Sequence, residues 1–463
     1  MLSRAFIAAV FSVVFYSTAH AQEVLSLQSA LETAVHNYGS IKAKESYRLS
    51  SQESVELARR QSLPNLNFSI QQDFGTVNGQ NGPLYGFGGY GTASSGLPLP
   101  EQNWNAAFGS LYLANANWEF FSFGKAKQRI KVAESKTQRD TRDLSDEVFQ
   151  HKVKVAAAYI NVLAAKELKL SYEKNLNRTD TIRRIVEVKE RNGLVPGVDL
   201  SLAKADYANA MITYTKAKDN EQEQENKLAQ LMGIPSQEFV LDNTLLQRIP
   251  TDLPSGTEFS LENHPLLSLY KSRIEVSEQE KQLLKTQYYP SLSMVGIIQM
   301  RASGFGNGYA QNQNDFTTSY WDGINPTRTN YLIGVGISWN LTQTFRLSKE
   351  ISAQDYNSQG LKHEYDLAEQ QLKAQMDLSE TKWKNSLTVY DQVPVQLKSA
   401  NDAYIQRSVL YKNGLTDLVD LSQAIYALIR AETDRDIAVS NVWNALLLKA
   451  AASGDFSVFE SRL

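Results

Sequence analysis

The stretch NGLVPGVDLSLA occupies residues 192–203, and a near copy, NGLTDLVDLSQA, occupies residues 413–424. The Asn, Gly, Leu, Val, Asp, Leu, Ser and Ala of the first stretch recur in register in the second, 221 residues later. Each stretch has a turn-forming Gly followed six residues later by an Asp. A phrase repeated at this distance indicates that the chain contains two copies of one structural unit.

The repetition extends well beyond this phrase. QSLPNLNFS at 61–69 is echoed by QYYPSLSMV at 287–295, and NWEFFSFGKAKQRI at 117–130 by SWNLTQTFRLSKEI at 338–351. The order of these landmarks predicts a tandem duplication. The expected segments are a first repeat (22–232), a Pro-rich connector or equatorial region (233–261), a second repeat (262–450) and a C-terminal tail (451–463).

Each repeat is expected to run in the order helix, strand, long polar loop, strand, very long helix, turn and helix. In the first repeat the predicted strands lie at about 63–75 and 106–121, and the predicted later helices at about 124–191 and 197–232. In the second repeat the strands lie at about 288–301 and 330–343, and the helices at about 345–411 and 417–450.

The predicted strands alternate between apolar and polar residues, although the pattern in 106–121 is less clean. In 64–74 the even positions are mostly apolar, whereas the odd positions are Asn, Ser, Gln and Asp. An amphipathic sheet that covers a soluble core would show the same period, but its outer face would commonly be rich in Lys and Glu. Here the polar face is mostly Asn, Gln, Ser and Gly, which favours strands about ten residues long that cross a bilayer around a water-filled lumen.

The two long helices are unusual for their length. Between residues 124 and 191 the sequence contains no proline and no internal glycine, and between 345 and 411 only Gly360 and Pro394 interrupt it. At 1.5 Å per residue each helix would be about 100 Å long. Because an isolated helix of this kind does not persist in water, each must pack against partners, including the returning helix after its turn.

Composition limits the class of protein. The 463 residues include no cysteine and carry a formal charge of −3, which excludes disulfides and thiolate metal sites and argues against a nucleic-acid binder. Residues 1–21 resemble a secretory signal peptide, with Arg4 before an apolar run and Ala19-His20-Ala21 as a cleavage site. The five His are isolated and no metal-ligand or catalytic spacing is found, so we expect no enzyme activity, metal or cofactor.

The strand count requires an oligomer. Four strands cannot close a membrane barrel, and open edges would leave unsatisfied backbone groups in lipid. Three chains would supply twelve strands, although the count alone also permits a dimer with eight. We favour the trimer and expect a mixed α and β membrane protein with four strands per chain, whose long helices project from one mouth of the barrel into the periplasm as a second, helical tube.

The chain resembles the TolC family of outer-membrane efflux proteins over nearly its whole length after residue 21. The resemblance rests on the tandem repeat, the strand starts LPNLNFS and YPSLSMV, LMGIP at 231–235, NHPLL at 263–267 and the two NGL-x-x-x-VDL phrases. It implies a trimeric 12-stranded outer-membrane β-barrel continued by a long periplasmic α-helical barrel. It also implies a homotrimer in the outer membrane of a Gram-negative bacterium, with a periplasmic adaptor protein and an inner-membrane transporter as partners and no nucleic acid.

The resemblance also implies roles for the repeated phrases, as the helix–helix turns at the periplasmic tip. Gly193 and Gly414 would support the turns, Asp420 would constrict the pore, and Asp199 and Tyr411 would tie the closed tip together. Within the second repeated phrase the sequence departs from the family's pattern at two positions, with Thr416 where Arg is expected and Gln423 where a second Asp is expected. A carboxylate in the first turn of a helix is also simply stabilised by the helix dipole, which is the structural alternative for both aspartates.

Three classes of function remain open from the sequence. The first is a passive exit duct of a tripartite efflux system that carries small molecules such as drugs and toxic compounds. The second is the same duct in one-step (type I) protein secretion. The third is a periplasmic coiled-coil protein without a transport role, against which the alternating strands argue.

Overall fold

The computed structural model describes residues 24–79, 97–250 and 261–462. The expected signal peptide therefore lies outside the described residues, as do parts of the first loop and of the connector. The described chain forms two compact units. One is helical and comprises the described residues of 1–47, 141–271 and 364–463; the other comprises residues 48–140 and 272–363 and contains the strands.

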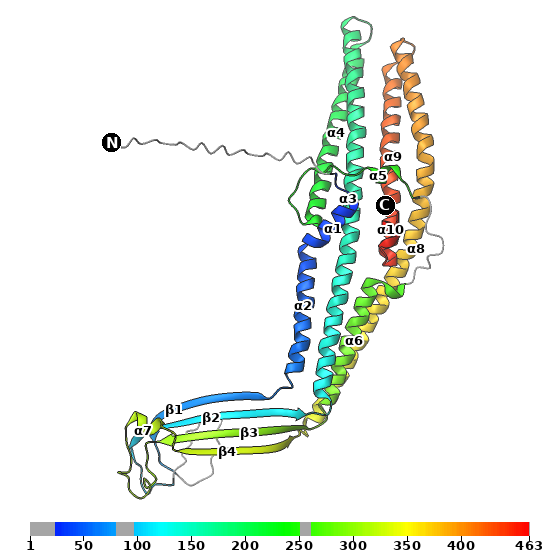
Figure 1. Cartoon of the computed structure of the whole chain (residues 1–463). Helices are drawn as coiled ribbons and strands as arrows, with labels where there is room; N and C mark the ends of the chain where they lie inside the picture. The colour runs from blue at the N-terminus through cyan, green and yellow to red at the C-terminus, as the bar shows by residue number, and fades with distance from the viewer. Residues whose placement is uncertain (1–23, 80–96, 251–260, 463) are drawn as a thin grey trace, which may run out of the picture. The chain divides into compact units, whose positions relative to one another are not determined.

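The second unit is built around a sheet of four antiparallel strands in the order β1-β2-β3-β4 (Figure 1). The strands are β1 (Asn65–Thr76), β2 (Ala106–Phe121), β3 (Ser291–Ser303) and β4 (Arg328–Ser338). Each repeat contributes one hairpin, and β2 pairs with β3 to join them, from Gly109↔Ser303 to Phe121↔Leu292. The outer edges of β1 and β4 have no strand partner among the described residues.

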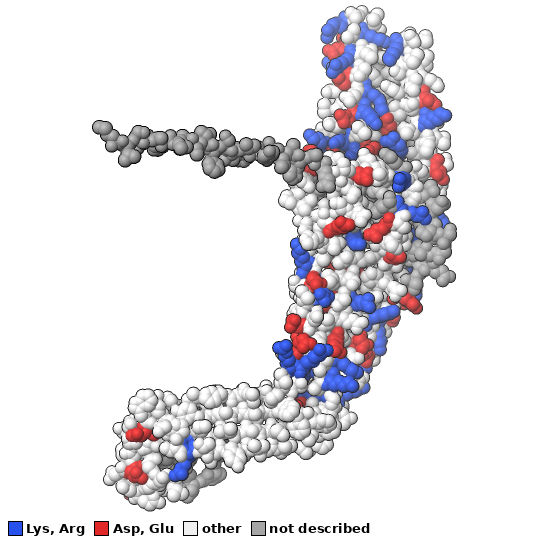
Figure 2. Space-filling view, in the orientation of Figure 1, with Lys and Arg blue, Asp and Glu red and all other residues white. Residues whose placement is uncertain are grey.

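The two faces of the sheet differ in chemistry. Even-numbered residues of β1 and odd-numbered residues of β4 share one face, and their large apolar side chains are exposed: Leu66, Phe68, Ile70, Phe74, Tyr331, Ile333, Val335 and Ile337. The opposite face carries Asn67, whose amide donates a 3.1 Å hydrogen bond to Asn115 across the strands. Figure 2 shows that the visible surface over the strands is almost free of charged residues, which gather over the helices.

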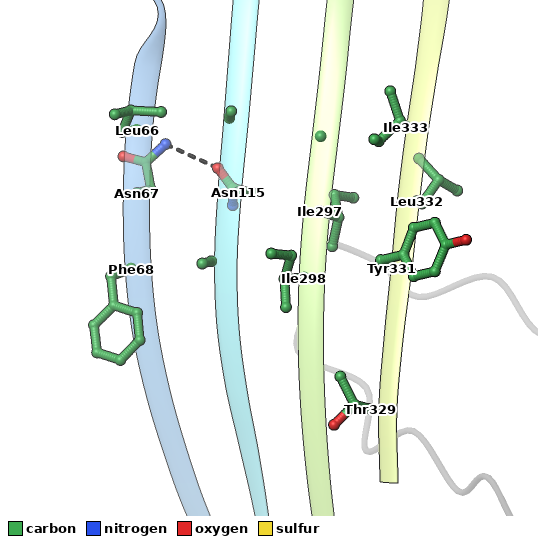
Figure 3. A pocket seen from close by; sticks show the side chains of 13 residues that line it. Leu66, Asn67, Phe68, Asn115, Ile297, Ile298, Thr329, Tyr331, Leu332 and Ile333 are labelled. Carbon is green, nitrogen blue, oxygen red and sulfur yellow. Dashed lines mark hydrogen bonds between the residues drawn. The ribbon is translucent and has the colours of Figure 1, made fainter.

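The apolar face is hollowed by a groove of about 710 Å³ (Figure 3). Small residues on the two central strands, Ala114, Ala116 and Gly296, lie between larger side chains on the edge strands, including Phe68 and Tyr331. The groove is therefore lined almost entirely by hydrocarbon. A large exposed apolar surface of this kind would be unfavourable in water.

The strand β4 ends at Ser338, short of the 343 expected from alternation. The side chains keep the alternating pattern through Leu341, but the backbone turns after Ser338 to begin a helix. Asn340 accepts a hydrogen bond from the backbone N–H of Gln343, and the Trp339 indole donates to the Tyr288 carbonyl at 3.2 Å. Local capping thus ends the strand where periodicity alone does not.

Long helices follow the strands of each repeat. They are α3 (Lys125–Arg191) with its returning partner α4 (Gly197–Met232), and α8 (Gln343–Lys412) with α9 (Leu418–Ser453). α8 continues through Pro394 as one helix. The remaining helices are α1 (Leu27–Asn37), α2 (Gly39–Arg60), α5 (Thr244–Gln247), α6 (Pro265–Thr286), α7 (Tyr320–Ile324) and α10 (Ser457–Glu460), with a 3-10 turn at Leu261–Asn263.

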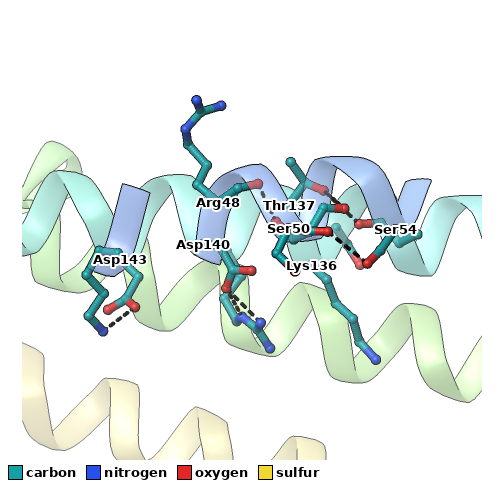
Figure 4. A network of polar contacts seen from close by, with 12 residues as sticks. Arg48, Ser50, Ser54, Lys136, Thr137, Asp140 and Asp143 are labelled. Carbon is teal, nitrogen blue, oxygen red and sulfur yellow. Dashed lines mark hydrogen bonds and ion pairs between the residues drawn. The ribbon is translucent and has the colours of Figure 1, made fainter. Parts of the chain in front are cut away.

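Within the strand-containing unit, polar contacts line the long helices. Thr137 on α3 donates a 3.0 Å hydrogen bond to the Ser51 carbonyl of α2, in the network of Figure 4. Lys136 on α3 pairs with Glu280 on α6 at 2.7 Å. These contacts give the first part of α3 two neighbouring helices, which a helix of its length needs for stability.

The helical unit has the largest apolar core. Trp443 and Tyr159 are almost completely buried in it, and their polar atoms are satisfied: the Trp443 indole donates to the Leu245 carbonyl and the Tyr159 hydroxyl to the Leu25 carbonyl. The expected C-terminal tail also belongs to this core, because Phe459 of α10 is fully buried against Trp443. Among the described residues, no helix is both long and apolar enough to cross a membrane.

Candidate functional site

The two repeated phrases form two helix-to-helix turns with the same backbone geometry. Gly193 ends α3 with φ of 70°, and Gly414 ends α8 with φ of 73°. The N–H of Leu194 donates to the carbonyl of Lys189 at 2.8 Å, and Leu415 makes the equivalent bond to Leu410 at 2.9 Å. This left-handed helix ending favours glycine, so each Gly is explained by the turn itself.

The two predicted aspartates lie in the first turns of the returning helices, Asp199 in α4 and Asp420 in α9. Asp417 caps α9, since its side chain accepts a 2.9 Å hydrogen bond from the Asp420 N–H. The equivalent cap position of α4 is Pro196, whose side chain makes no capping hydrogen bond. Both aspartates are partly exposed, as expected for carboxylates that the positive end of a helix stabilises.

Tyr411 lies in a small apolar core that joins the two turn regions. This core combines Val186 and Ala203 of the first hairpin with Leu418, Leu421 and Ile425 of the second. Tyr411 is buried, and its hydroxyl has no hydrogen-bond partner among the described residues. Burial, and next the nearby charge of Asp199, raise the pKa of the Tyr411 hydroxyl. The structure thus brings Tyr411 near Asp199 without a hydrogen bond between them.

Asp420 is held within its own hairpin. Its Oδ2 accepts hydrogen bonds from the Thr416 hydroxyl at 2.6 Å and from the Arg407 guanidinium at 2.9 Å. Thr416 lies in the turn and Arg407 on α8, so both partners move with the same pair of helices. Thr416, which stands where the family usually has Arg, therefore binds the predicted constriction residue directly. Gln423 is exposed.

One polar contact between the hairpins involves Asp206, which the sequence analysis did not single out. Asp206 on α4 accepts a 2.6 Å hydrogen bond from the Tyr426 hydroxyl and a 2.8 Å bond from the Ser422 hydroxyl, both on α9. The sequence does contain a signal: Asp206 follows Asp199 by seven residues, which is two helical turns on one face, and Ser422 and Tyr426 are four apart.

Further from the turns, charged pairs join α3 to α9. Arg178 forms a bidentate, largely buried ion pair with Glu432, and the Ser171 hydroxyl donates to buried Asp436 at 2.7 Å. No group of three or more His, Asp or Glu residues in the described part of the chain is arranged to hold a metal ion. The polar contacts of this region therefore hold α3 and α9 together.

Comparison with known proteins agrees with this geometry. Residues 30–234 match the outer membrane efflux protein family. The CmeC outer membrane channel of Campylobacter jejuni superposes with a TM-score of 0.74 at 15% identity, covering 92% of this chain and 85% of CmeC. For the outer membrane protein VceC of Vibrio cholerae the TM-score is 0.71 at 16% identity, with 93% and 96% covered. No curated protein sequence matches significantly.

The MtrE outer membrane channel of Neisseria gonorrhoeae, solved in its open state, has the same fold, with a TM-score of 0.67 at 15% identity over 93% of this chain and 89% of MtrE. The fold is therefore that of an outer-membrane channel. The likeness to the outer membrane efflux protein family covers residues 30–234, and the solved channels share the fold of nearly the whole chain.

Proposed function

We propose that the protein is the trimeric exit duct of a tripartite efflux system, which passes small molecules from an inner-membrane transporter and a periplasmic adaptor to the outside. The observation that carries this proposal is the sheet. Among the described residues the outer edges of β1 and β4 have no strand partner, and one face of the sheet is apolar and exposed. In lipid those edges must pair, and three copies would close a barrel of twelve strands.

The two faces of the sheet indicate which one would face lipid and which one the pore in a closed barrel. The face with Phe68 and Ile333 would contact lipid, and the face with Asn67 and Asn115 would line the aqueous pore. By register that face also carries Leu113, Ile297 and Leu332, so its lining is mixed rather than wholly polar. The duct would be passive, and the energy for transport would come from the inner-membrane partner.

The turns would form the periplasmic end of the duct. In a trimer, Asp199 and Asp420 would each be presented three times around one axis, and a ring of carboxylates favours cations at a constriction. Tyr411 would contribute by apolar packing between the hairpins and Thr416 by fixing the Asp420 carboxylate, whereas Gln423 leaves the ring with fewer charges.

The same turns offer a docking surface for the adaptor. Leu194 and Leu415 occupy equivalent positions in the two repeats, and each is 71% exposed at the tip of its turn. Val198 and Val419 are exposed beside them. Apolar residues exposed in equivalent places on both turns are a feature of a protein-binding surface, and in a trimer six such turns would lie together.

The test is transport in the native host. Deleting the gene should increase sensitivity to toxic small molecules, and deleting the partner transporter should give the same sensitivity without an additive effect. Efflux that survives deletion of every candidate inner-membrane partner would contradict the proposal. Loss of a secreted protein with unchanged sensitivity to small molecules would instead favour one-step protein secretion.

A further inference from the structure

The short helix α7 lies against one face of the sheet, at the end of the strands away from the long helices (Figure 1). The ring of Tyr320 meets the ring of Phe108 on β2, with centroids 5.2 Å apart. At Gly323 the helix is so close to β2 that an added Cβ would lie 2.4 Å from the Cβ of Phe108. Phe108 pairs with Phe74 of β1, so α7 lies on the apolar face that the proposed function turns toward lipid.

Three polar side chains on this face are covered by α7. The hydroxyls of Ser110 and Tyr112 both donate to the Ile324 carbonyl, at 3.1 and 3.0 Å. The Tyr320 hydroxyl donates to the side-chain oxygen of Gln72 at 3.0 Å. A polar group that faces hydrocarbon without a partner is costly. The helix therefore satisfies groups that lipid could not satisfy.

The outer surface of α7 has the chemistry of a membrane interface. Trp321 is 73% exposed, and its ring meets the ring of Tyr320 edge-on with centroids 5.2 Å apart. The next residue, Asp322, is exposed and charged, which disfavours burial of the helix in hydrocarbon. Trp and Tyr are enriched at the level of the lipid headgroups, because their rings are apolar and their polar atoms reach water.

The spacing along β2 places α7 at one edge of an apolar band. At the other end of β2, Trp118 is exposed on the same face, and its indole N–H donates to the Ser62 carbonyl at 2.8 Å. Phe108, beneath α7, lies ten residues before Trp118, which is about 33 Å along a strand. At a tilt of about 40° this length spans a height of about 25 Å, the height of the apolar band of a membrane β-barrel.

We propose that α7 is an interfacial anchor, which holds Trp321 and Tyr320 in the lipid headgroup layer at the outer edge of the barrel. The inference rests on the proposed function, which places this face of the sheet in lipid, and adds a segment of the second loop that binds the membrane surface. A lipid surface is the partner because the exposed rings of α7 continue the lipid-facing side of the sheet.

The experiment uses nitroxide labels on single introduced cysteines, since the chain has no cysteine of its own. Trp321→Cys reports on α7, Ile333→Cys on the apolar face of β4 and Tyr356→Cys on an exposed position of α8. The full-length protein is reconstituted in phosphatidylcholine vesicles, and collisions of each label with oxygen and with a water-soluble nickel chelate are measured by electron paramagnetic resonance. The label at 333 should meet mostly oxygen, the label at 356 mostly the chelate, and the label at 321 both at intermediate rates.

A second substitution tests the contact between α7 and the sheet. Gly323→Ala, added to Trp321→Cys, should push the helix away from Phe108 and raise chelate collisions at residue 321 to the level found at 356. Gly334→Ala is the matched control, because nothing lies within 4 Å of a Cβ added there, and it should leave the collisions at 321 unchanged.

Intermediate collisions at 321 that Gly323→Ala abolishes would support the anchor. Full access of the chelate to 321, full burial in the oxygen-rich hydrocarbon, or protection from both reagents by a protein neighbour would each overturn it. Collisions that Gly323→Ala leaves unchanged would also overturn it. In these cases a label at 333 that meets oxygen leaves the proposed duct standing. A label at 333 that meets the chelate as freely as the label at 356 would contradict the proposed duct itself, and the anchor with it.

Discussion

The side chain of Lys189 on α3 stands over the ring of Tyr411 on α8, with its Nζ 4.5 Å from the ring centroid. The same Nζ donates a 3.2 Å hydrogen bond to the Tyr411 carbonyl. Tyr411 is therefore held through its ring and its backbone, while its buried hydroxyl has no partner among the described residues. Lys189, which the sequence analysis did not identify, connects the first hairpin to the second at this point.

This relationship predicts that the Tyr411 hydroxyl is dispensable for stability. Because a buried hydroxyl without a partner costs about 1–3 kcal/mol, Tyr411→Phe should leave the free energy of unfolding unchanged or raise it slightly. Tyr159→Phe is the matched control, since the Tyr159 hydroxyl donates a 2.8 Å hydrogen bond to Leu25, and it should lower stability by about 1 kcal/mol. Thermal unfolding of the two variants checks this, and a clear loss of stability in Tyr411→Phe would show that the hydroxyl has a partner in the trimer.

The turn glycines predict opposite effects for one kind of substitution. Gly193→Ala and Gly414→Ala should each destabilise the protein by about 1 kcal/mol, because both backbones have positive φ. Gly360→Ala should stabilise it by roughly 0.5–1 kcal/mol, since Gly360 is exposed inside α8 with open space around its Cα. Equal shifts in unfolding temperature for all three variants would contradict the assigned turn geometry.

The exposed leucines of the turns predict a separation of transport from folding. Leu194→Glu combined with Leu415→Glu should abolish adaptor-dependent efflux, because charges replace the apolar docking surface on both turns. Assembly and channel conductance should be retained, since neither side chain is buried in the described chain. The pair Leu194→Met and Leu415→Met should keep efflux. Normal efflux in the Glu variant would place the docking surface elsewhere.

Two buried histidines predict loss of stability in mild acid. Burial lowers the pKa of His264 and of His151 below the ordinary value of 6.5. The Nδ1 of His264 accepts a hydrogen bond from the Leu266 N–H, and its Nε2 faces the Ala451 carbonyl. Protonation of the neutral ring at Nδ1 would therefore break the hydrogen bond from Leu266. Because the unfolded chain binds protons more readily, the stabilisation is complete above about pH 6.5 and falls as the pH drops further.

Unfolding temperatures at pH 7.5 and pH 5.5 measure this effect. His264→Gln should flatten the pH dependence even if it lowers stability at pH 7.5. The exposed His363 supplies a control, and His363→Gln should leave the slope unchanged. An equal slope in wild type and in His264→Gln would assign the acid sensitivity to other groups.

The sequence predicted the architecture because its signals are periodic. Alternation along residues such as Leu66, Phe68 and Ile70 reports the faces of a strand, and the absence of helix breakers reports a long helix. Neither signal reports where backbone pairing stops, which is why β4 ends at Ser338 while the side-chain pattern runs on to Leu341.

The candidate site was less predictable for a different reason. The turn glycines could be predicted from local sequence alone, because a positive φ at the end of a helix favours glycine in any context. The contacts of Asp206 depend on how two hairpins more than 200 residues apart in the sequence pack together, whereas the partners of Asp420 depend on packing within one hairpin. Arg407 and Tyr426 carry no motif of their own, so their contacts appear only in three dimensions.

The measurement that tests the proposed duct most directly is the single-channel conductance of the purified, mass-confirmed trimer in a planar bilayer, recorded for wild type and Asp420→Ala. We predict a small, cation-selective conductance in wild type and reduced selectivity in the variant, because the variant lacks one ring of carboxylates. A folded trimer with no conductance, or a protein that stays monomeric in detergent and does not insert, would contradict the account.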